Sequence, residues 1–345
     1  MMLHPLVLAL TAVDLAAVVL MILAGITNAQ ILVGWQPHDP GSRQLNLERR
    51  SEAASMQARW SVLLFFLGSL LLVMGVSSVL PKLVPGAMCG TGVVQASNGL
   101  IGRALFFRLL ALLLLSVWQM VDRLHRSLPC SPIVLLTSRL QLLAVPVAGV
   151  AIWSTLTALA SLDVHTPVDC CSVLFDQIRS TSQAAITTGL SDAFLVRGTC
   201  ALTSLLMILT IVFATQTKLC NRAIASLIGL LTPITVLMAA VCLVRVLSAY
   251  HYGVLHHHCP WCLFLSEHTW VGYPMFGSLI VILLQSGQIT VATFLAHSGN
   301  LLHPHVLGTA QTRARVMIAG WIVFVLLGVV PPLIWRLEHG VWMSG

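Results

Sequence analysis

Residues 5–30 read PLVLALTAVDLAAVVLMILAGITNAQ, and Asp14 is the only charged residue in this stretch. A helix that crosses the hydrocarbon core of a bilayer, about 30 Å thick, needs about twenty predominantly apolar residues. No Lys or Arg precedes the stretch, which is also longer than the apolar core of a signal peptide. We therefore interpret residues 5–30 as a membrane-spanning helix and not as a signal sequence.

Seven further stretches have the length and apolar character of membrane spans. They are residues 61–81, 104–122, 134–160, 198–217, 223–247, 273–297 and 316–336. Charged residues make up only 8% of the 345 positions and apolar residues 57%, whereas soluble domains have about 25% charged residues. The sequence predicts an all-α, polytopic transmembrane bundle of about eight spans, forming a single integral membrane domain over residues 1–345 in the lipid bilayer.

Positive charges gather in the linkers after the first, third, fifth and seventh predicted spans. These are Arg43, Arg49, Arg50, Arg59, Arg123, Arg126, Arg139, Lys218, Arg222, Arg313 and Arg315. The positive-inside rule places such linkers in the cytoplasm, so both termini and the loops 82–103, 161–197 and 248–272 are expected outside. We expect a bacterial inner (plasma) membrane protein whose outer loops face the periplasm or exterior. No stripe of Lys and Arg resembles a nucleic-acid-binding surface, so the net charge of +7 predicts no nucleic-acid partner.

Every predicted outer loop contains cysteine. Cys89 lies in the first loop, Cys170 and Cys171 are adjacent in the second, and Cys259 and Cys262 form a C-x-x-C in the third. Thiols outside the cytoplasm usually form disulfides, so one interpretation is a non-catalytic membrane subunit whose loops are stapled together.

The C-P-W-C sequence also fits a redox role. Proline suits the first turn of a helix, which predicts Cys259 at a helix N-cap, where the helix dipole lowers the pKa of a thiol. The aromatic stretch 260–271 is typical of a membrane surface, where a thiol pair meets both a lipid-soluble quinone and a water-side disulfide. We expect Trp261 and Arg245 to contact the quinone and His268 to handle protons.

The C-P-W-C at the outer end of a predicted membrane helix, with further cysteines in other outer loops, resembles the vitamin K epoxide reductase family and the bacterial quinone-linked thiol oxidases. In those families a loop pair exchanges disulfides with a soluble thioredoxin-like protein and then with a helix-end C-x-x-C, which passes electrons to a quinone. The resemblance implies that Cys259 and Cys262 are the quinone-linked pair. It also implies that Cys89, Cys170 or Cys171 exchange with an exported partner.

The same segment contains possible metal ligands. His256, His257 and His258 directly precede Cys259, and thiolate with imidazole suits zinc or Cu(I). Three functions therefore remain open. They are a thiol–disulfide oxidoreductase that relays electrons between exported thiols and the quinone pool, a copper- or zinc-handling membrane protein, and a stapled subunit that associates with other membrane subunits.

Charged residues near or inside the spans are further candidates. A carboxylate within a membrane is costly, so we expect Asp14 either to face a wet cavity or to make an inter-helix hydrogen bond. Arg103 and Arg108 fall near the predicted outer end of the third span. There an arginine either binds a quinone carbonyl or extends to the lipid headgroups.

Overall fold

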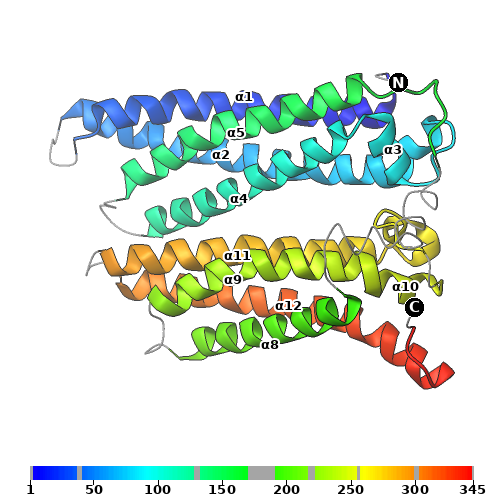
Figure 1. Cartoon of the computed structure of the whole chain (residues 1–345). Coiled ribbons are helices and arrows are strands. Elements are labelled where there is room, and N and C mark those ends of the chain that lie inside the picture. The colour runs from blue at the N-terminus through cyan, green and yellow to red at the C-terminus, as the bar shows by residue number, and fades with distance from the viewer. Residues whose placement is uncertain are drawn as a thin grey trace. The chain divides into compact units, whose positions relative to one another are not determined.

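The computed structural model describes residues 3–36, 41–127, 133–169, 191–216, 222–254, 257–298 and 303–343, and these residues form helices and loops without any strand. Within this part of the chain, eight helical stretches are long and apolar enough to cross a membrane (Figure 1). They are Pro5–Gly34, Ser42–Leu83, Leu100–Ser127, Val134–Ala160, Asp192–Thr215, Arg222–Tyr252, Gly272–Ala296 and Val306–His339. The predicted all-α, polytopic fold is thus confirmed.

The chain divides into two compact units. Unit 1 consists of Met1–Val84 and Val93–Thr166, and unit 2 of Pro85–Gly92 and Pro167–Gly345. Four of the eight spans belong to each unit. The sequence predicted a single membrane domain over residues 1–345. It has no internal repeat that would indicate a division into two units.

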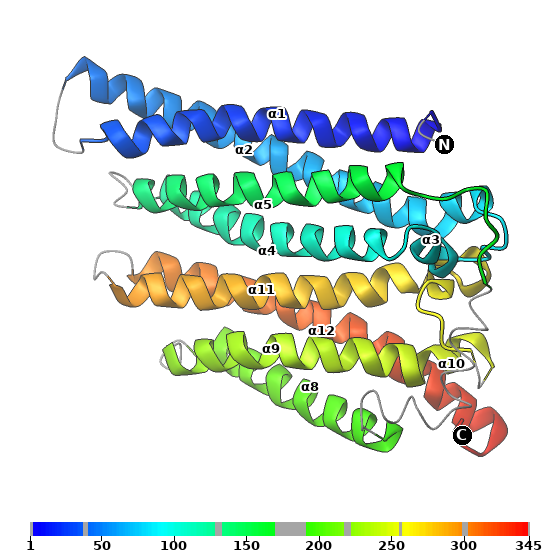
Figure 2. The same ribbon diagram turned by 45° about the horizontal axis from the view of Figure 1, so that its top comes forward.

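Unit 1 is a four-helix bundle. Its helices are α1 (Pro5–Gly34), α2 (Ser42–Met74), α4 (Leu100–Ser127) and α5 (Val134–Ala160). Helix α1 packs on α2 and α5, and α4 packs on α5 and α2 (Figure 2). Met21, Phe65, Leu115 and Ala148, one from each helix, belong to its buried apolar core. Helix α2 continues through a π-helical turn (Gly75–Val79) and a 3-10 turn (Leu80–Leu83).

Unit 2 contains a second four-helix arrangement, formed by α8 (Asp192–Thr215), α9 (Arg222–Cys242), α11 (Gly272–Ser298) and α12 (His303–His339). Helix α8 packs on α9 and α12, and α11 packs on α9 and α12. The Ser191 side chain accepts a hydrogen bond from Phe194 N at 3.2 Å and so caps α8. A π-helical turn (Leu243–Leu247) joins α9 to the short α10 (Ser248–Tyr252).

Two loops of unit 2 position the cysteines. Residues 257–271 lie between α10 and α11 and include two 3-10 turns, Cys262–Phe264 and Ser266–His268. Residues 85–92 form the second loop together with the first residues of the short helix α3 (Gly90–Ala96). Val168 N donates to the Pro85 carbonyl at 3.0 Å, which fixes the start of this second loop. The placement of both loops and both termini outside the membrane stays a prediction.

Candidate functional site

Three cysteines from the two loops of unit 2 meet in one buried cluster. The Cys89 and Cys259 sulfurs are 3.3 Å apart, although the residues are 170 positions apart in the chain. The Cys262 sulfur completes a group in which all three sulfurs lie within 4.8 Å of one another. Cys259 is 0% exposed, Cys89 1% and Cys262 8%, so solvent has almost no direct access to the sulfurs. We call these three residues the thiol cluster.

Small residues in the loop 85–92 allow the loop 257–271 to pack closely against it. A Cβ added to Gly90 would lie 2.5 Å from the Trp261 ring, so only glycine lets the indole pack against this backbone. A Cβ added to Gly92 would lie 2.6 Å from the Ala87 Cβ. Gly86 has a φ of +80°, a conformation that favours glycine. The loop is therefore closely fitted around the cysteine it carries.

Polar groups contact the sulfurs of Cys259 and Cys262. The Thr91 hydroxyl lies 3.0 Å from the Cys259 sulfur, and His257 Nε2 lies 3.3 Å from the Cys262 sulfur. The Tyr252 hydroxyl donates a hydrogen bond to the Cys259 carbonyl. A hydroxyl can donate a hydrogen bond to a thiolate or accept one from a thiol, and an imidazole nitrogen can likewise donate or accept.

The structure corrects the expected helix cap at Cys259. Cys259 and Pro260 precede a three-residue 3-10 turn that begins at Cys262, and Trp261 is the residue before that turn. The next long helix, α11, begins only at Gly272. The N–H groups of a long helix therefore do not face the Cys259 sulfur, which instead contacts the Thr91 hydroxyl.

An aromatic, apolar layer lies against the thiol cluster. Trp261 and Tyr252 pack against it, and Phe264 lies 5.7 Å from Trp261 between ring centroids. Phe264 also contacts the Tyr273 ring edge-on at 4.9 Å and stacks on Phe276 at 5.5 Å. The surroundings of the sulfurs are thus apolar on the side that leads to α11.

The other predicted ligand and proton-handling residues lie in distinct places. Arg245 forms an ion pair with Asp192 at 2.7 Å, so its guanidinium is already engaged by a carboxylate. His268 packs edge-on against the Tyr252 ring, with centroids 4.5 Å apart. Burial lowers the pKa of His268 below its ordinary value, the nearby Glu267 opposes this shift, and His257 lowers the pKa by a smaller amount. Cys170, Cys171 and His256 lie outside the described residues.

Within the described residues, the group of side chains able to hold a metal consists of the three cysteines and no histidine. His257 adjoins Cys262 but is not part of this group, and His258 is buried nearby in sequence. Three close sulfurs suit a soft ion such as Cu(I), while zinc requires a fourth ligand. Cys89 is therefore a candidate metal ligand in addition to those predicted from the sequence.

Sequence reasoning missed Thr91 and Tyr252 as neighbours of the sulfurs. Both contacts depend on how the loops fold, and a lone threonine or tyrosine in a loop has no distinctive pattern. Two glycines next to Cys89, Gly90 and Gly92, were the available signal. Their small size indicates that another chain segment packs closely there.

A second polar centre lies inside unit 1 and gives Asp14 a partner on another helix. Arg108 forms an ion pair with Asp14, and its Nε and Nη1 donate to the hydroxyls of Thr155 at 2.9 Å and Ser69 at 3.3 Å. The Arg108 side chain is only 2% exposed. The expectation that it extends to headgroups or a quinone was wrong, because its guanidinium is buried and held by these three side chains.

Comparison of this chain with protein-family models, with curated proteins and with solved structures finds no match.

Proposed function

We propose that this protein is a membrane thiol–disulfide oxidoreductase that relays electrons between exported thiols and the quinone pool, with Cys259 as the central sulfur. The observation that carries the proposal is the 3.3 Å contact between Cys89 and Cys259, with Cys262 in the same group of sulfurs. Cys259 thus has two alternative disulfide partners at one place. A structural staple needs one partner, whereas disulfide exchange needs a third thiol beside the bond.

The exchange step follows from these positions. The Cys89 thiolate attacks the sulfur of Cys259 in a Cys259–Cys262 disulfide. A Cys89–Cys259 disulfide forms, the Cys259–Cys262 bond breaks, and Cys262 leaves as a thiolate. His257, 3.3 Å from that sulfur, supplies the proton that converts it to a thiol. The step transfers the disulfide without net oxidation.

The redox step requires a second reactant, for which we propose a quinone. When two cluster thiols become a disulfide, they release two electrons and two protons, and the quinone becomes a quinol. The apolar aromatic layer of Trp261 and Phe264 suits such a ring. The nearly complete burial of Cys259 excludes a bulky protein from its sulfur, so a thioredoxin-like partner would exchange with another thiol. Cys170 and Cys171 are our candidates, on the proposed periplasmic side of the bacterial inner membrane.

The test uses full-length protein, reduced and placed in lipid nanodiscs, to which a short-chain quinone is added. Acid quenching, alkylation and peptide mass spectrometry then locate the thiols that are lost. We expect a disulfide that joins Cys259 to Cys89 or Cys262. Cys259→Ser should slow this loss of thiols at least about tenfold, while the control Cys242→Ser, which alters a buried cysteine outside the cluster, should not. Cluster thiols that stay alkylatable after quinone addition would contradict the proposal.

A second candidate function rests on the same three sulfurs, because three close thiols also form a soft-metal site. For a copper- or zinc-handling protein, we expect about one metal ion per chain after incubation with Cu(I) or zinc, and a loss of that metal in Cys89→Ser. The histidine-based set predicted from the sequence would instead keep its metal in this variant. Wild-type protein without bound metal would remove the candidate.

A further inference from the structure

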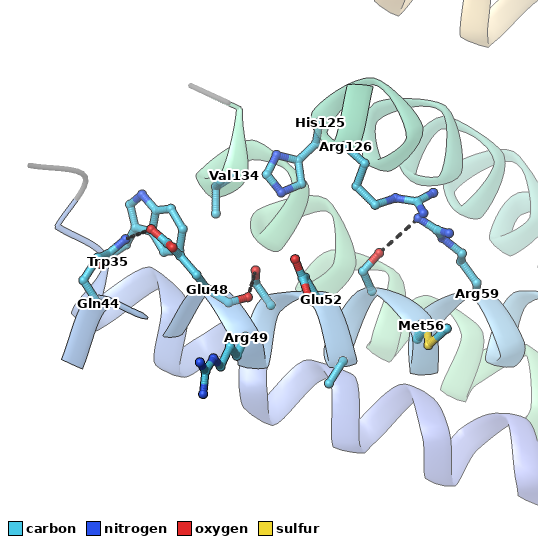
Figure 3. A pocket seen from close by; sticks show the side chains of 13 residues that line it. Trp35, Gln44, Glu48, Arg49, Glu52, Met56, Arg59, His125, Arg126 and Val134 are labelled. Atoms are coloured by element: carbon cyan, nitrogen blue, oxygen red, sulfur yellow. Dashed lines mark hydrogen bonds between the residues drawn. The ribbon is translucent and has the colours of Figure 1, made fainter. Parts of the chain in front are cut away.

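A groove opens at the end of unit 1 where α4 ends and α5 begins. It has a volume of about 880 Å³. Residues on one side of the polar first half of α2 line the groove, and the last turn of α4 lines it opposite them (Figure 3). Glu48 and Glu52 on α2 and His125 on α4 line it, together with Trp35 after α1. The charge pattern of the sequence predicts that this end of the unit faces the cytoplasm.

A much smaller cavity shares part of the groove's lining. Ser51, Ser55 and His125 line both. Trp118 and Ser138 line the small cavity alone, and its volume is about 20 Å³. One water molecule needs a space of about 10–15 Å³. The cavity is therefore large enough for a single water molecule and too small for an organic ligand.

Two side chains of this cavity have hydrogen-bonding atoms without a protein partner. The Trp118 side chain is only 1% exposed, and its indole N–H has no partner among the described residues. His125 Nδ1 is likewise buried without one. Leaving a buried polar group unsatisfied destabilises the fold, so such groups normally bind ordered water.

The charge balance argues against an ion in this cavity. Asp122, which also lines it, is 0% exposed and contacts Arg59 at 2.7 Å, Arg126 at 3.3 Å and Ser55 at 2.5 Å. Its carboxylate is therefore already neutralised and does not attract a cation. The lining offers an indole donor, hydroxyl groups and an imidazole nitrogen, a mixture of donors and acceptors that suits water.

We propose that this cavity is a buried water site, supplied from the groove, in which water hydrogen-bonds the Trp118 indole and His125. The inner part of unit 1 is then a hydrated vestibule and not a dry helix bundle. Its water gives the Asp122 network a hydrogen-bonded connection to the cytoplasmic solvent. The site is independent of the thiol cluster in unit 2 and of its proposed chemistry.

The test is hydroxyl-radical footprinting of the full-length protein in nanodiscs, because radicals generated in situ oxidise side chains next to bound water. Trp118 should be oxidised at least about tenfold faster than Phe65, which is fully buried in the apolar core of the same bundle. Equal protection of the two aromatic residues would overturn the proposal, and this comparison requires no variant.

A variant pair tests the route. Ser138→Val fills the cavity and removes a hydroxyl, so oxidation of Trp118 should fall several-fold. Ser154→Val makes the same change on the same helix, where the Ser154 hydroxyl bonds the Val150 carbonyl, and should leave that oxidation unchanged. Unchanged oxidation in Ser138→Val, or an equal fall in both variants, would show that radicals do not reach Trp118 through this cavity.

Discussion

The buried ion pair of unit 1 yields a quantitative prediction about folding stability. Asp14 and Arg108 have side chains that are 1% and 2% exposed. Removing one partner of such a pair leaves an uncompensated buried charge and costs about 3–5 kcal/mol. We therefore expect Asp14→Leu and Arg108→Met each to lower the free energy of unfolding by about 4 kcal/mol, nearly a thousandfold in the folding equilibrium.

The double variant should behave differently. Ser69 and Thr155, which accept hydrogen bonds from Arg108, also donate to the carbonyls of Phe65 and Ala151 in their own helices. They stay hydrogen-bonded when the guanidinium is removed. Replacing both charged residues by apolar ones therefore leaves little unsatisfied, and we expect the double variant to lie within about 1 kcal/mol of wild type.

Equilibrium unfolding in lipid bicelles, followed by steric trapping or by circular dichroism during denaturant titration, measures these differences. Arg50→Met is the control, because Arg50 is exposed and bonds Gln30 at 3.1 Å, and it should change stability by less than about 0.5 kcal/mol. Two results would refute the reasoning. One is a single variant that costs less than about 1 kcal/mol, and the other is a double variant as unstable as the worse single variant.

Three further predictions concern close packing and pH. Gly68→Ala should destabilise unit 1 in the same assay by about 1–3 kcal/mol, because its Cβ would lie 2.3 Å from the Asp14 carboxylate. The control Gly149→Ala should be neutral or stabilising, because its Cβ would meet no atom within 4 Å. Gly90→Ala should displace the indole beside it and raise the rate of maleimide labelling of reduced Cys259 severalfold; an unchanged rate would contradict the packing described. Because the pKa of His268 is lowered on folding, its contribution to stability should be complete above its unfolded pKa of about 6.5 and should be lost as the pH falls toward its folded pKa. Imidazole NMR signals followed through a pH titration would show this lowered pKa, and a normal value would refute it.

The sequence predicts spans well because apolar length is a local property. The fourth span was expected at 134–160 and is observed at Val134–Ala160. The second was expected from residue 61, yet α2 begins at Ser42. Its first half is too polar for a hydropathy argument, but it is rich in helix-forming Glu, Arg, Gln and Ala. Hydropathy locates the part of a helix that lipid can cover, and not the whole helix.

Small errors at helix ends also changed the interpretation of single residues. The third span was expected from residue 104, whereas α4 begins at Leu100, and four residues of helix correspond to about 6 Å of length. Arg108, expected near the interface, is instead buried in the bundle and pairs with Asp14 of another helix. Pairing between residues of different spans depends on which sides of the helices pack together. Hydropathy along one sequence does not show which sides these are.

The thiol cluster shows the same limit for the site and adds a consequence of its own. The C-P-W-C was visible in the sequence, whereas the contact of Cys259 with Cys89 depends on chain folding across 170 positions. The two possible disulfides of Cys259 therefore differ in what they constrain. A bond to Cys262 closes a ring within one loop, while a bond to Cys89 ties the loops 85–92 and 257–271 together covalently, and a longer closed loop restricts the unfolded chain more strongly. Disulfide exchange at Cys259 would thus change both the position of the oxidised pair and the tethering of the two loops. A site that served only as a staple would have no use for the second, local partner.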